Sequence, residues 1–348
     1  MAIALNNNPA HLVQLCEQLE LGNARDVPTQ VAGGFHHRMW LLETDRERYA
    51  VKQLAPDTDL ANPDYRSHYD TTEAIAERFA GEGVPALHAL GRYGHYLQII
   101  DRSGYLVYPW TDATAIDKEN VSLPHALAVA DILAKMHSAD IVAPHPRPLL
   151  LPVEPDEQVI NLVEAAAQNE LDNAARLQAL LPDFLQIREA QQAATPVLEQ
   201  HKVISHGDLD QKNVLWDSQG KPLVIDWESA GLINPSYEIL LEALDWGGIT
   251  SSFNLGIFEQ IIAHYQQCGG SLRGDFIAPA FDAILGEWLD WLMYNLGRIV
   301  YLEDRKQRDL GSEQLEPTLT TIIGLREKRA ELQDCAYKLV GADGRSIG

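Results

Sequence analysis

The amino-acid sequence predicts an α+β protein with two lobes, a small lobe built on an antiparallel sheet and a larger, mostly helical lobe. Three observations support this fold class. The chain has 348 residues, which is enough for about two domains. Short β-like segments around one helical segment fill its first third, whereas long helical patterns dominate after Trp110. One further hairpin-like pair of segments interrupts these helices near residue 220.

The first lobe is predicted from two hairpins and a helix. Residues 39–43 and 48–54 are strand-like runs on either side of a polar Thr-Asp-Arg-Glu turn. Residues 97–100 and 105–108 flank the turn residues Asp-Arg-Ser-Gly in the same way. Between the two pairs, residues 71–80 have a helical pattern that two following glycines end. Together these segments indicate a small antiparallel sheet accompanied by one helix.

The second lobe is predicted from long helical patterns. Residues 126–137 carry apolar side chains at helical spacing. Prolines then crowd residues 144–155, which indicates an extended surface connection. Residues 157–193 are rich in Ala, Leu and Gln and predict one or two helices, with a break near Pro182. A last helix is expected over residues 313–339.

The densest chemical pattern is the stretch His-Gly-Asp-Leu-Asp-Gln-Lys-Asn at positions 206–213. Asn213 opens a β-like run, and a polar turn leads to a returning strand that ends at Asp226. Because a hairpin places the ends of its strands side by side, Asn213 and Asp226 can share one cation. Amide and carboxylate oxygens are ligands that suit Mg²⁺. Asp208 lies close to the proposed ligand Asn213 in the sequence, and its carboxylate can orient an attacking hydroxyl or accept its proton.

This stretch resembles the aminoglycoside phosphotransferase/choline kinase-like family, a branch of the protein-kinase-like superfamily. The family pattern is His-Gly-Asp, four residues, Asn, then Ile-Asp after a short hairpin and Gly five residues later. Ile225, Asp226 and Gly231 complete this pattern here. The resemblance implies a bilobal protein-kinase-like fold, with Asp208 as the catalytic base. It also implies that Asn213 and Asp226 are the metal ligands.

A kinase-like protein also needs residues that bind ATP in its first lobe. Lys52 lies in an apolar Tyr-Ala-Val-Lys strand, and a lysine that points into a sheet-lined cleft is costly unless it is paired. We expect Glu73 on the next helix to pair with it, with Glu77 one turn later as the alternative. The family places its glutamate eight residues before a Gly-X-Gly-Val-Pro segment, and Glu73 has this spacing. Lys52 would then face the α- and β-phosphates.

Two backbone features are also expected to contact the nucleotide. Gly33 and Gly34 would form a hairpin turn over the phosphates, because backbone N–H groups approach closely where no Cβ intervenes. A Tyr-Pro-Trp-Thr segment occupies the position of the family's hinge, where the backbone recognises adenine. Proline lacks an N–H but keeps its carbonyl. Pro109 would therefore supply the carbonyl and Thr111 the N–H.

The resemblance divides the chain into an N-lobe that binds the nucleotide (1–108), a hinge (109–112) and a helical C-lobe (113–348). The C-lobe would contain the catalytic loop, the metal site and the acceptor pocket. The implied cofactors are ATP and Mg²⁺. The implied activity is ATP-dependent transfer of the γ-phosphoryl group to a hydroxyl of a small molecule.

The acceptor is expected to bind in the second lobe. Residues 201–300 contain 13 acidic and 5 basic residues, together with several tryptophans. Carboxylates and aromatic faces attract ammonium groups, which favours a cationic, aminoglycoside-like acceptor. Asp210, Glu228 and Asp245 are the candidates for acceptor binding, although each can equally be a solvated acid on a loop or helix.

Two alternative functions stay open. The first is a metabolic small-molecule kinase of the choline, homoserine or methylthioribose type. The second is a catalytically silent, nucleotide-binding pseudokinase on the same fold. Pseudokinases usually lose the lysine, the base or a metal ligand, whereas this chain has Lys52, Asp208, Asn213 and Asp226. Turnover with a panel of acceptors distinguishes the alternatives.

Composition argues against several other classes of protein. The net charge of −23, from 50 acidic and 27 basic residues, disfavours binding to nucleic acid. The three cysteines form no Cys-x-x-Cys pair, which argues against a zinc site or a disulfide framework. No run of about 18 apolar residues predicts a membrane span, and no basic N-terminal region predicts a secretory signal. We therefore expect a cytoplasmic protein with no nucleic-acid or membrane partner, and the oligomeric state is left open.

Overall fold

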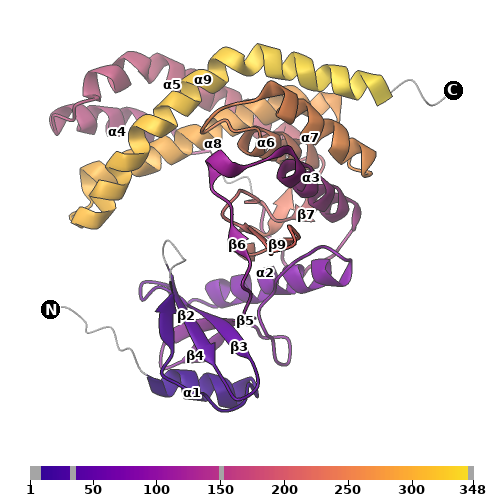
Figure 1. Cartoon of the computed structure of the whole chain (residues 1–348). Coiled ribbons are helices and arrows are strands. Elements are labelled where there is room, and N and C mark those ends of the chain that lie inside the picture. The colour runs from indigo at the N-terminus through magenta and orange to yellow at the C-terminus, as the bar shows by residue number, and fades with distance from the viewer. Residues whose placement is uncertain (1–8, 32–36, 149–152, 344–348) are drawn as a thin grey trace. The chain divides into compact units, whose positions relative to one another are not determined.

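The computed structural model describes residues 9–31, 37–148 and 153–343, and Figure 1 shows the chain with its elements labelled. The chain divides into two compact units. The first unit comprises Met1–Ile116, Ile141–Arg147 and Lys212–Gly231. The second unit comprises Asp117–Asp140, Pro148–Gln211 and Leu232–Gly348. The hairpin predicted to carry the metal ligands therefore belongs to the same unit as the N-terminal sheet.

A five-stranded antiparallel sheet forms the N-terminal part of the first unit. Its strands lie in the order β1-β2-β3-β5-β4. Their bounds are β1 (Thr29–Val31), β2 (Arg38–Glu43), β3 (Arg48–Gln53), β4 (Gln98–Ile100) and β5 (Ser103–Pro109). The two predicted hairpins are the antiparallel pairs β2–β3 and β4–β5, so both predictions are confirmed. β3 lies in the middle of the sheet between β2 and β5.

Two helices accompany this sheet. α1 (Pro9–Gln18) contributes Leu15 to an apolar cluster that also contains Val51 of β3. α2 (Pro63–Gly81) includes the predicted helical segment and buries Glu73 among the apolar residues of its inner face. A buried glutamate on this helix is the first indication that the N-terminal sheet and α2 position a polar site.

A second sheet completes the first unit. Its antiparallel strands, in the order β6-β8-β9, are β6 (Thr114–Ala115), β8 (Val214–Trp216) and β9 (Pro222–Val224). β8 and β9 form the predicted hairpin, with Val214 opposite Val224. The short 3-10 helix η2 (Trp227–Ser229) follows, and the buried Trp227 ring stacks on Phe79 of α2 with centroids 5.5 Å apart. This aromatic contact attaches the end of the hairpin to α2.

Helices form most of the second unit. They are η1 (Lys118–Asn120), α3 (Leu123–Ser138), α4 (Asp156–Gln168), α5 (Ala174–Leu198), α6 (Pro235–Trp246), α7 (Leu255–Gln267), α8 (Gly274–Tyr301) and α9 (Arg305–Asp343). The short strands β7 (Val203–Ser205) and β10 (Gly231–Ile233) pair with each other. α8 packs against both α5 and α9. The predicted α+β class, with an antiparallel sheet in the N-terminal region and helices in the C-terminal region, is confirmed.

One predicted helix boundary is wrong. The sequence predicted a break near Pro182, but Pro182 lies inside α5, and the break falls between α4 and α5. The chain turns there through Glu170, which has a positive φ of 54°. A proline inside a helix removes one backbone hydrogen bond. The side chains of Leu177 and Phe184 on either side of it are buried, and their packing offsets this loss.

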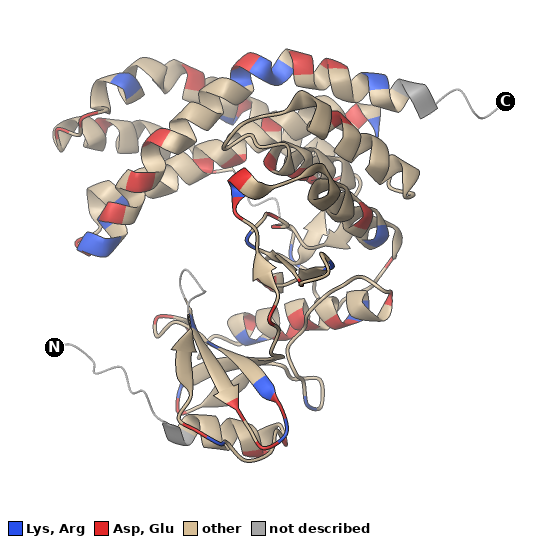
Figure 2. Cartoon of the chain, viewed as in Figure 1, with Lys and Arg blue, Asp and Glu red and all other residues tan. Residues whose placement is uncertain are grey.

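The surfaces of the helices carry charges of both signs. Figure 2 shows acidic residues on α2 and on α9, where they alternate with basic residues. The net charge of −23 is therefore spread along the chain instead of lying on one element. In the described parts of the chain, no helix combines the length and the apolar character needed to cross a membrane.

Candidate functional site

The β8–β9 hairpin positions the two predicted metal ligands. Asn213 directly precedes β8, and its backbone carbonyl accepts a hydrogen bond from the N–H of Ile225 at 2.9 Å. Asn213 and Asp226 therefore lie at the same end of the hairpin. Asn213 is buried, whereas 40% of the Asp226 side chain is exposed. Asp226 has a φ of 61°, in the left-handed region that Asp tolerates better than most residues.

The ammonium group of Lys52, on β3, contacts two carboxylates. Its Nζ lies 2.9 Å from Oδ1 of Asp226 and 2.6 Å from Oε1 of Glu228. The same Glu228 oxygen is 3.4 Å from Nε2 of His37. Lys52 is buried, and an unpaired ammonium at such a position would be strongly destabilising. The two carboxylates therefore account for a lysine in the interior of the first unit.

These contacts fix the charges around Lys52. Burial by itself lowers the pKa of Lys52, but the charges of Glu228 and Asp226 outweigh burial and raise this pKa above its ordinary value. Burial has the opposite effect on Glu228, yet the hydrogen bond from His37 and the charge of Lys52 lower its pKa to about 2. Lys52 is therefore a cation and Glu228 an anion at neutral pH. A fixed cation at the end of the hairpin can bind phosphate oxygens.

Glu73 on α2 does not form the expected ion pair with Lys52. Its Oε1 accepts a hydrogen bond from the Tyr108 hydroxyl and its Oε2 accepts one from the Ala89 N–H, each at 2.6 Å. The predicted pair is wrong because the hairpin and η2 supply both carboxylates that bind Lys52. Burial raises the pKa of Glu73 to about 7, although the two hydrogen bonds limit the rise. Glu73 thus links α2 to β5.

The end of β5 contains the two residues predicted to contact adenine. Pro109 is exposed, and the N–H of the next residue, Trp110, donates to the carbonyl of Arg48 at 3.0 Å. Among the residues that the structure describes, no backbone carbonyl accepts a hydrogen bond from the N–H of Thr111. A ligand could therefore use this N–H, and the contacts of Pro109 and Thr111 with adenine stay predictions.

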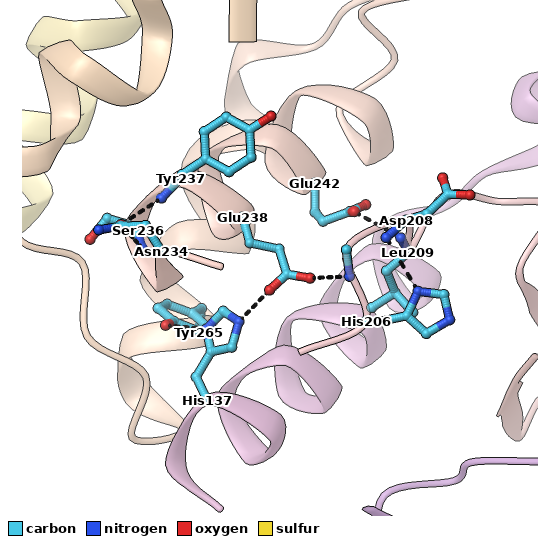
Figure 3. Close-up of polar contacts among 11 residues, drawn as sticks. His137, His206, Asp208, Leu209, Asn234, Ser236, Tyr237, Glu238, Glu242 and Tyr265 are labelled. Atoms are coloured by element: carbon cyan, nitrogen blue, oxygen red, sulfur yellow. Dashed lines mark hydrogen bonds and ion pairs between the residues drawn. The ribbon is translucent and has the colours of Figure 1, made fainter. Parts of the chain in front are cut away.

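In the second unit, two glutamates of α6 bind the loop that carries Asp208. The backbone N–H of Gly207 donates to Oε1 of Glu238 at 2.8 Å, and the N–H of Leu209 donates to Oε1 of Glu242 at 3.0 Å. Glu238 and Glu242 are one helical turn apart, so both face the loop. Figure 3 shows that the Asp208 carboxylate points away from both glutamates. The backbone on either side of Asp208 is therefore fixed while its carboxylate is directed elsewhere.

Glu238 also connects this loop to α3 and α7. Its Oε2 lies 2.6 Å from Nε2 of His137, and Nδ1 of His137 lies 2.7 Å from the Tyr265 hydroxyl. Burial alone raises the pKa of Glu238, but the hydrogen bond and charge of His137, together with the hydrogen bond from Gly207, bring this pKa below its ordinary value. Glu238 is thus a buried anion with hydrogen-bond donors at both oxygens.

Asp208 belongs to a cluster of acidic residues in the second unit. Burial and the charge of Asp210 raise the pKa of Asp245 to about 7, which Lys118 partly counteracts. Burial and the charge of Asp245 raise the pKa of Glu242 well above its ordinary value. Within the described residues, Oε2 of Glu242 is buried without a hydrogen-bond partner. Such mutual repulsion between acids is relieved when a cation binds.

The predicted site residues fall into two sets. Those in the first unit, around the hairpin, are Lys52, Asn213, Asp226 and Glu228. The acids in the second unit are Asp208, Asp210 and Asp245. Glu228 was predicted to contact the acceptor, and its ion-pair partners in the structure are Lys52 and His37. Gly33 and Gly34 lie outside the described residues.

Sequence reasoning did not single out the residues that support the Asp208 loop. Glu238 and Glu242 were grouped with other acids of the second lobe, and His137 with the other histidines. One signal could have found the glutamates, because α6 has the sequence Tyr-Glu-Ile-Leu-Leu-Glu-Ala-Leu around them. A helix that is apolar on nearly all sides is buried, and its few charged residues are then buried with it.

The raised pKa of Glu73 makes stability depend on pH. The folded protein keeps this proton up to about pH 7, whereas the unfolded chain loses it near the ordinary value of 4.5. Stability from this group is therefore present below pH 4.5 and lost as the pH rises to about 7. We expect the free energy of unfolding of Glu73→Gln, measured with urea, to rise relative to that of wild type between pH 4.5 and pH 7.5. The expected rise is roughly 3 kcal/mol.

The substituted glutamine can accept from Ala89 and donate to the Tyr108 hydroxyl, so its hydrogen bonds are conserved. Glu77→Gln is the matched control. Glu77 lies one turn later on α2, also accepts a hydrogen bond from a tyrosine, Tyr96, and is exposed. A free-energy difference between Glu73→Gln and wild type that is the same at both pH values would contradict a proton held by Glu73.

Comparisons with known proteins agree with this geometry. The sequence model described as "Phosphotransferase enzyme family" matches residues 28–270. No curated protein matches the chain at the level of sequence. The fold is similar to that of solved structures, although their sequence identities are low.

Three of these structures illustrate the similarity. Spectinomycin phosphotransferase, in complex with ADP and spectinomycin, is 12% identical, with 94% of this chain and 97% of that chain covered and a TM-score of 0.60. The Plasmodium vivax ethanolamine kinase is 14% identical, with coverages of 92% and 90% and a TM-score of 0.57. The Streptococcus pneumoniae choline kinase is 15% identical, with coverages of 90% and 99% and a TM-score of 0.57. These similarities confirm the protein-kinase-like fold. The family match spans more than half of the residues of this chain, and the chain therefore belongs to the phosphotransferase enzyme family.

Proposed function

We propose that the protein transfers the γ-phosphoryl group of ATP to a hydroxyl group of a small, cationic acceptor. The observation that carries this proposal is the buried Lys52 ammonium, 2.9 Å from Asp226 at the end of the hairpin that begins at Asn213. A cation, a carboxylate and an amide in one place are the groups that a magnesium-bound polyphosphate requires. Membership of the phosphotransferase enzyme family supports the same reaction class.

The first unit would bind the nucleotide. Lys52 would contact the inner phosphates as a fixed point charge. The carbonyl of Pro109 and the N–H of Thr111 would recognise adenine. The spectinomycin phosphotransferase whose fold is similar is described in complex with ADP, which supports a nucleotide as the phosphoryl donor.

The residues at the hairpin end fit a magnesium ion. Only one Asp226 oxygen, Oδ1, contacts Lys52, and this side chain is 40% exposed. Within the described residues, no group of three or more His, Cys, Asp or Glu side chains could hold a metal ion. The chain would therefore supply only Asn213 and Asp226, as suits an ion that keeps waters and phosphate oxygens as ligands. When bound, Mg²⁺ would neutralise charge on the phosphates.

Asp208 would act on the acceptor. In the proposed step the acceptor oxygen forms a bond to the γ-phosphorus, and the bond from that phosphorus to the β–γ bridging oxygen breaks. ADP leaves, and Asp208 takes the proton of the acceptor hydroxyl. The hydrogen bonds from Gly207 and Leu209 to α6 support this role, because they fix the backbone on both sides of Asp208. A positioned base needs such a rigid loop.

The acidic cluster of the second unit favours a cationic acceptor. Asp208, Asp210, Glu242 and Asp245 repel one another, and Oε2 of Glu242 is buried without a hydrogen-bond partner in the described residues. An ammonium group on the acceptor would relieve both effects. Similar folds occur in a choline kinase and an ethanolamine kinase, and those names describe amino-alcohol acceptors. Aminoglycosides and amino alcohols are accordingly the two acceptor classes to compare.

The role of Asp208 can be tested by Asp208→Asn. We expect kcat to fall by about 100-fold or more, because the amide cannot accept the proton, while the affinity for ATP is unchanged. ADP release with a panel of aminoglycosides, amino alcohols and sugars measures turnover, and calorimetry measures ATP binding. Asp172→Asn, at an exposed position between α4 and α5, is the control and should keep full activity.

Undiminished turnover in Asp208→Asn would contradict its role as the base. A wild-type protein that binds ATP but phosphorylates no member of the panel would instead favour a silent nucleotide-binding protein.

The metal site can be tested by Asp226→Asn. Wild-type protein should bind ADP more tightly with Mg²⁺ than with EDTA, and the variant should bind it equally under both conditions, because the amide oxygen carries no charge. Calorimetry in the two buffers measures the difference. Asp217→Asn is the matched control at the other end of the hairpin, since its remaining side-chain oxygen can still accept from the turn N–H groups of Gln219 and Lys221. A magnesium effect that survives in Asp226→Asn would refute the assignment.

The charge of the acceptor can be tested through Asp245. Because the pKa of Asp245 is about 7, its negative charge grows as the pH rises from 6 to 8. The KM of a quaternary-ammonium alcohol, whose own charge does not change, should therefore fall over this range. In Asp245→Asn this KM should be about 10-fold higher or more and independent of pH. A neutral alcohol of similar size is the control, and an equal effect on its KM would argue against a cationic acceptor.

A further inference from the structure

A buried chain of hydrogen bonds ends at the loop that carries Asp208. The hydroxyl of Tyr265 on α7 lies 2.7 Å from Nδ1 of His137 on α3, and Nε2 of His137 lies 2.6 Å from Oε2 of Glu238. Oε1 of Glu238 accepts the N–H of Gly207 at 2.8 Å. None of the three side chains is more than 3% exposed. Figure 3 shows Glu238 between His137 and the loop.

The hydrogen-bond partners determine which atoms of Tyr265 and His137 carry protons. Glu238 is an anion that can only accept, so His137 must present an N–H at Nε2. With Nε2–H directed at Glu238, the unprotonated Nδ1 can accept the O–H of Tyr265 at 2.7 Å. A neutral imidazole with its proton on Nε2 satisfies both partners. The Glu238 carboxylate thereby selects the tautomer, and the hydroxyl of Tyr265 fixes the orientation of the ring that presents it.

We propose that Tyr265 and His137 are positioning residues for phosphoryl transfer. Tyr265 fixes the orientation of the His137 ring, and His137 in turn holds Glu238 in the conformation that binds Gly207. The orientation of Asp208 therefore depends on a hydroxyl group that acts only through His137 and Glu238. This inference rests on the proposed role of Asp208.

The expected effect of losing the Tyr265 hydroxyl is partial. Without that donor Nδ1 of His137 has lost its hydrogen bond, so the ring can turn and its Nε2–H then binds the Glu238 carboxylate less well. The Gly207 bond weakens, but Glu242 still accepts the N–H of Leu209 at 3.0 Å. The loop therefore loosens on one side of Asp208 only. We expect about a 10-fold loss in kcat, because small misplacements of a reacting group reduce rates steeply.

The chain contains a matched control for this experiment. In the first unit the Tyr105 hydroxyl lies 2.7 Å from Nδ1 of the buried His11, and the two rings meet edge to face at 5.9 Å. The rings of Tyr265 and His137 meet edge to face at 5.6 Å. Tyr105→Phe and Tyr265→Phe thus remove the same hydrogen bond from the same kind of pair. The partner of His11 beyond this bond is the exposed Asp101.

Both variants should lower the melting temperature by similar amounts. Only Tyr265→Phe should lower kcat about 10-fold with the KM of ATP unchanged. Two-bond ¹H–¹⁵N spectra of the histidine rings report the tautomer, with the His137 signals identified by their loss in His137→Gln. Wild type and Tyr105→Phe should show the same Nδ1 signal for His137, and Tyr265→Phe should shift it because Nδ1 loses its hydrogen bond. Nε2 should stay protonated in all three proteins. Because glutamine keeps an N–H donor, His137→Gln should retain more activity than His137→Leu.

Equal kcat values for the two phenylalanine variants would overturn the proposal, as would a His137 protonated on Nδ1 in wild type. The NMR measurement separates this proposal from the proposed function. If wild type phosphorylates no acceptor, the function fails while the tautomer of His137 is still measured. If wild type is active and the Nδ1 signal of His137 does not respond to Tyr265→Phe, the positioning role fails alone.

Discussion

The ion pairs of the buried Lys52 ammonium are the constraint on which the first unit depends. Lys52 on β3 and Asp226 after β9 are 174 residues apart in the sequence, yet their charged atoms lie 2.9 Å apart. Removing one partner from a buried pair typically costs about 3–5 kcal/mol. The hairpin end must therefore stay against the sheet, and the stacking of Trp227 on Phe79 supports this attachment. The need to pair this charge explains why the hairpin belongs to the N-terminal unit.

The second unit uses buried charge in a different way. Glu238 binds His137 and the N–H of Gly207, and Glu242 binds the N–H of Leu209. The pKa of Glu238 is lowered, whereas burial and the charge of Asp245 raise the pKa of Glu242. Each glutamate thus accepts one backbone N–H of the Asp208 loop. Two such bonds, on alternate residues, immobilise the loop without using the side chain between them. The backbone at Asp208 is therefore held independently of its carboxylate, to which we assign the proposed role of base.

The parts of the site that depend on local sequence could be predicted, and the parts that depend on distant partners could not. Asn213 and Asp226 lie at the same end of the hairpin because a short turn fixes the pairing of β8 with β9, and turn length can be counted in the sequence. Residue spacing could not predict the partner of Lys52, because Glu73 has the expected spacing but is hydrogen-bonded to Tyr108 and Ala89 instead. The choice of partner depends on tertiary packing, which spacing does not encode. Pro182 was overestimated as a helix breaker for the same reason.

The charged groups of the first unit and those of the second unit differ in how their neighbours shift their pKa values. Lys52 and Glu228 stabilise each other's charged forms, so the pKa of Glu228 falls to about 2 and that of Lys52 rises. Burial and the neighbouring acid Asp210 raise the pKa of Asp245 to about 7. A neighbour of opposite charge stabilises the charged form of a group and moves its pKa away from 7. A neighbour of like charge moves the pKa of an acid towards 7. A bound cation would draw the proton from Asp245, but nothing comparable would change Lys52. The charges of the first unit are therefore fixed by its own residues, whereas the charge of Asp245 in the second unit would increase on binding of the proposed cationic acceptor.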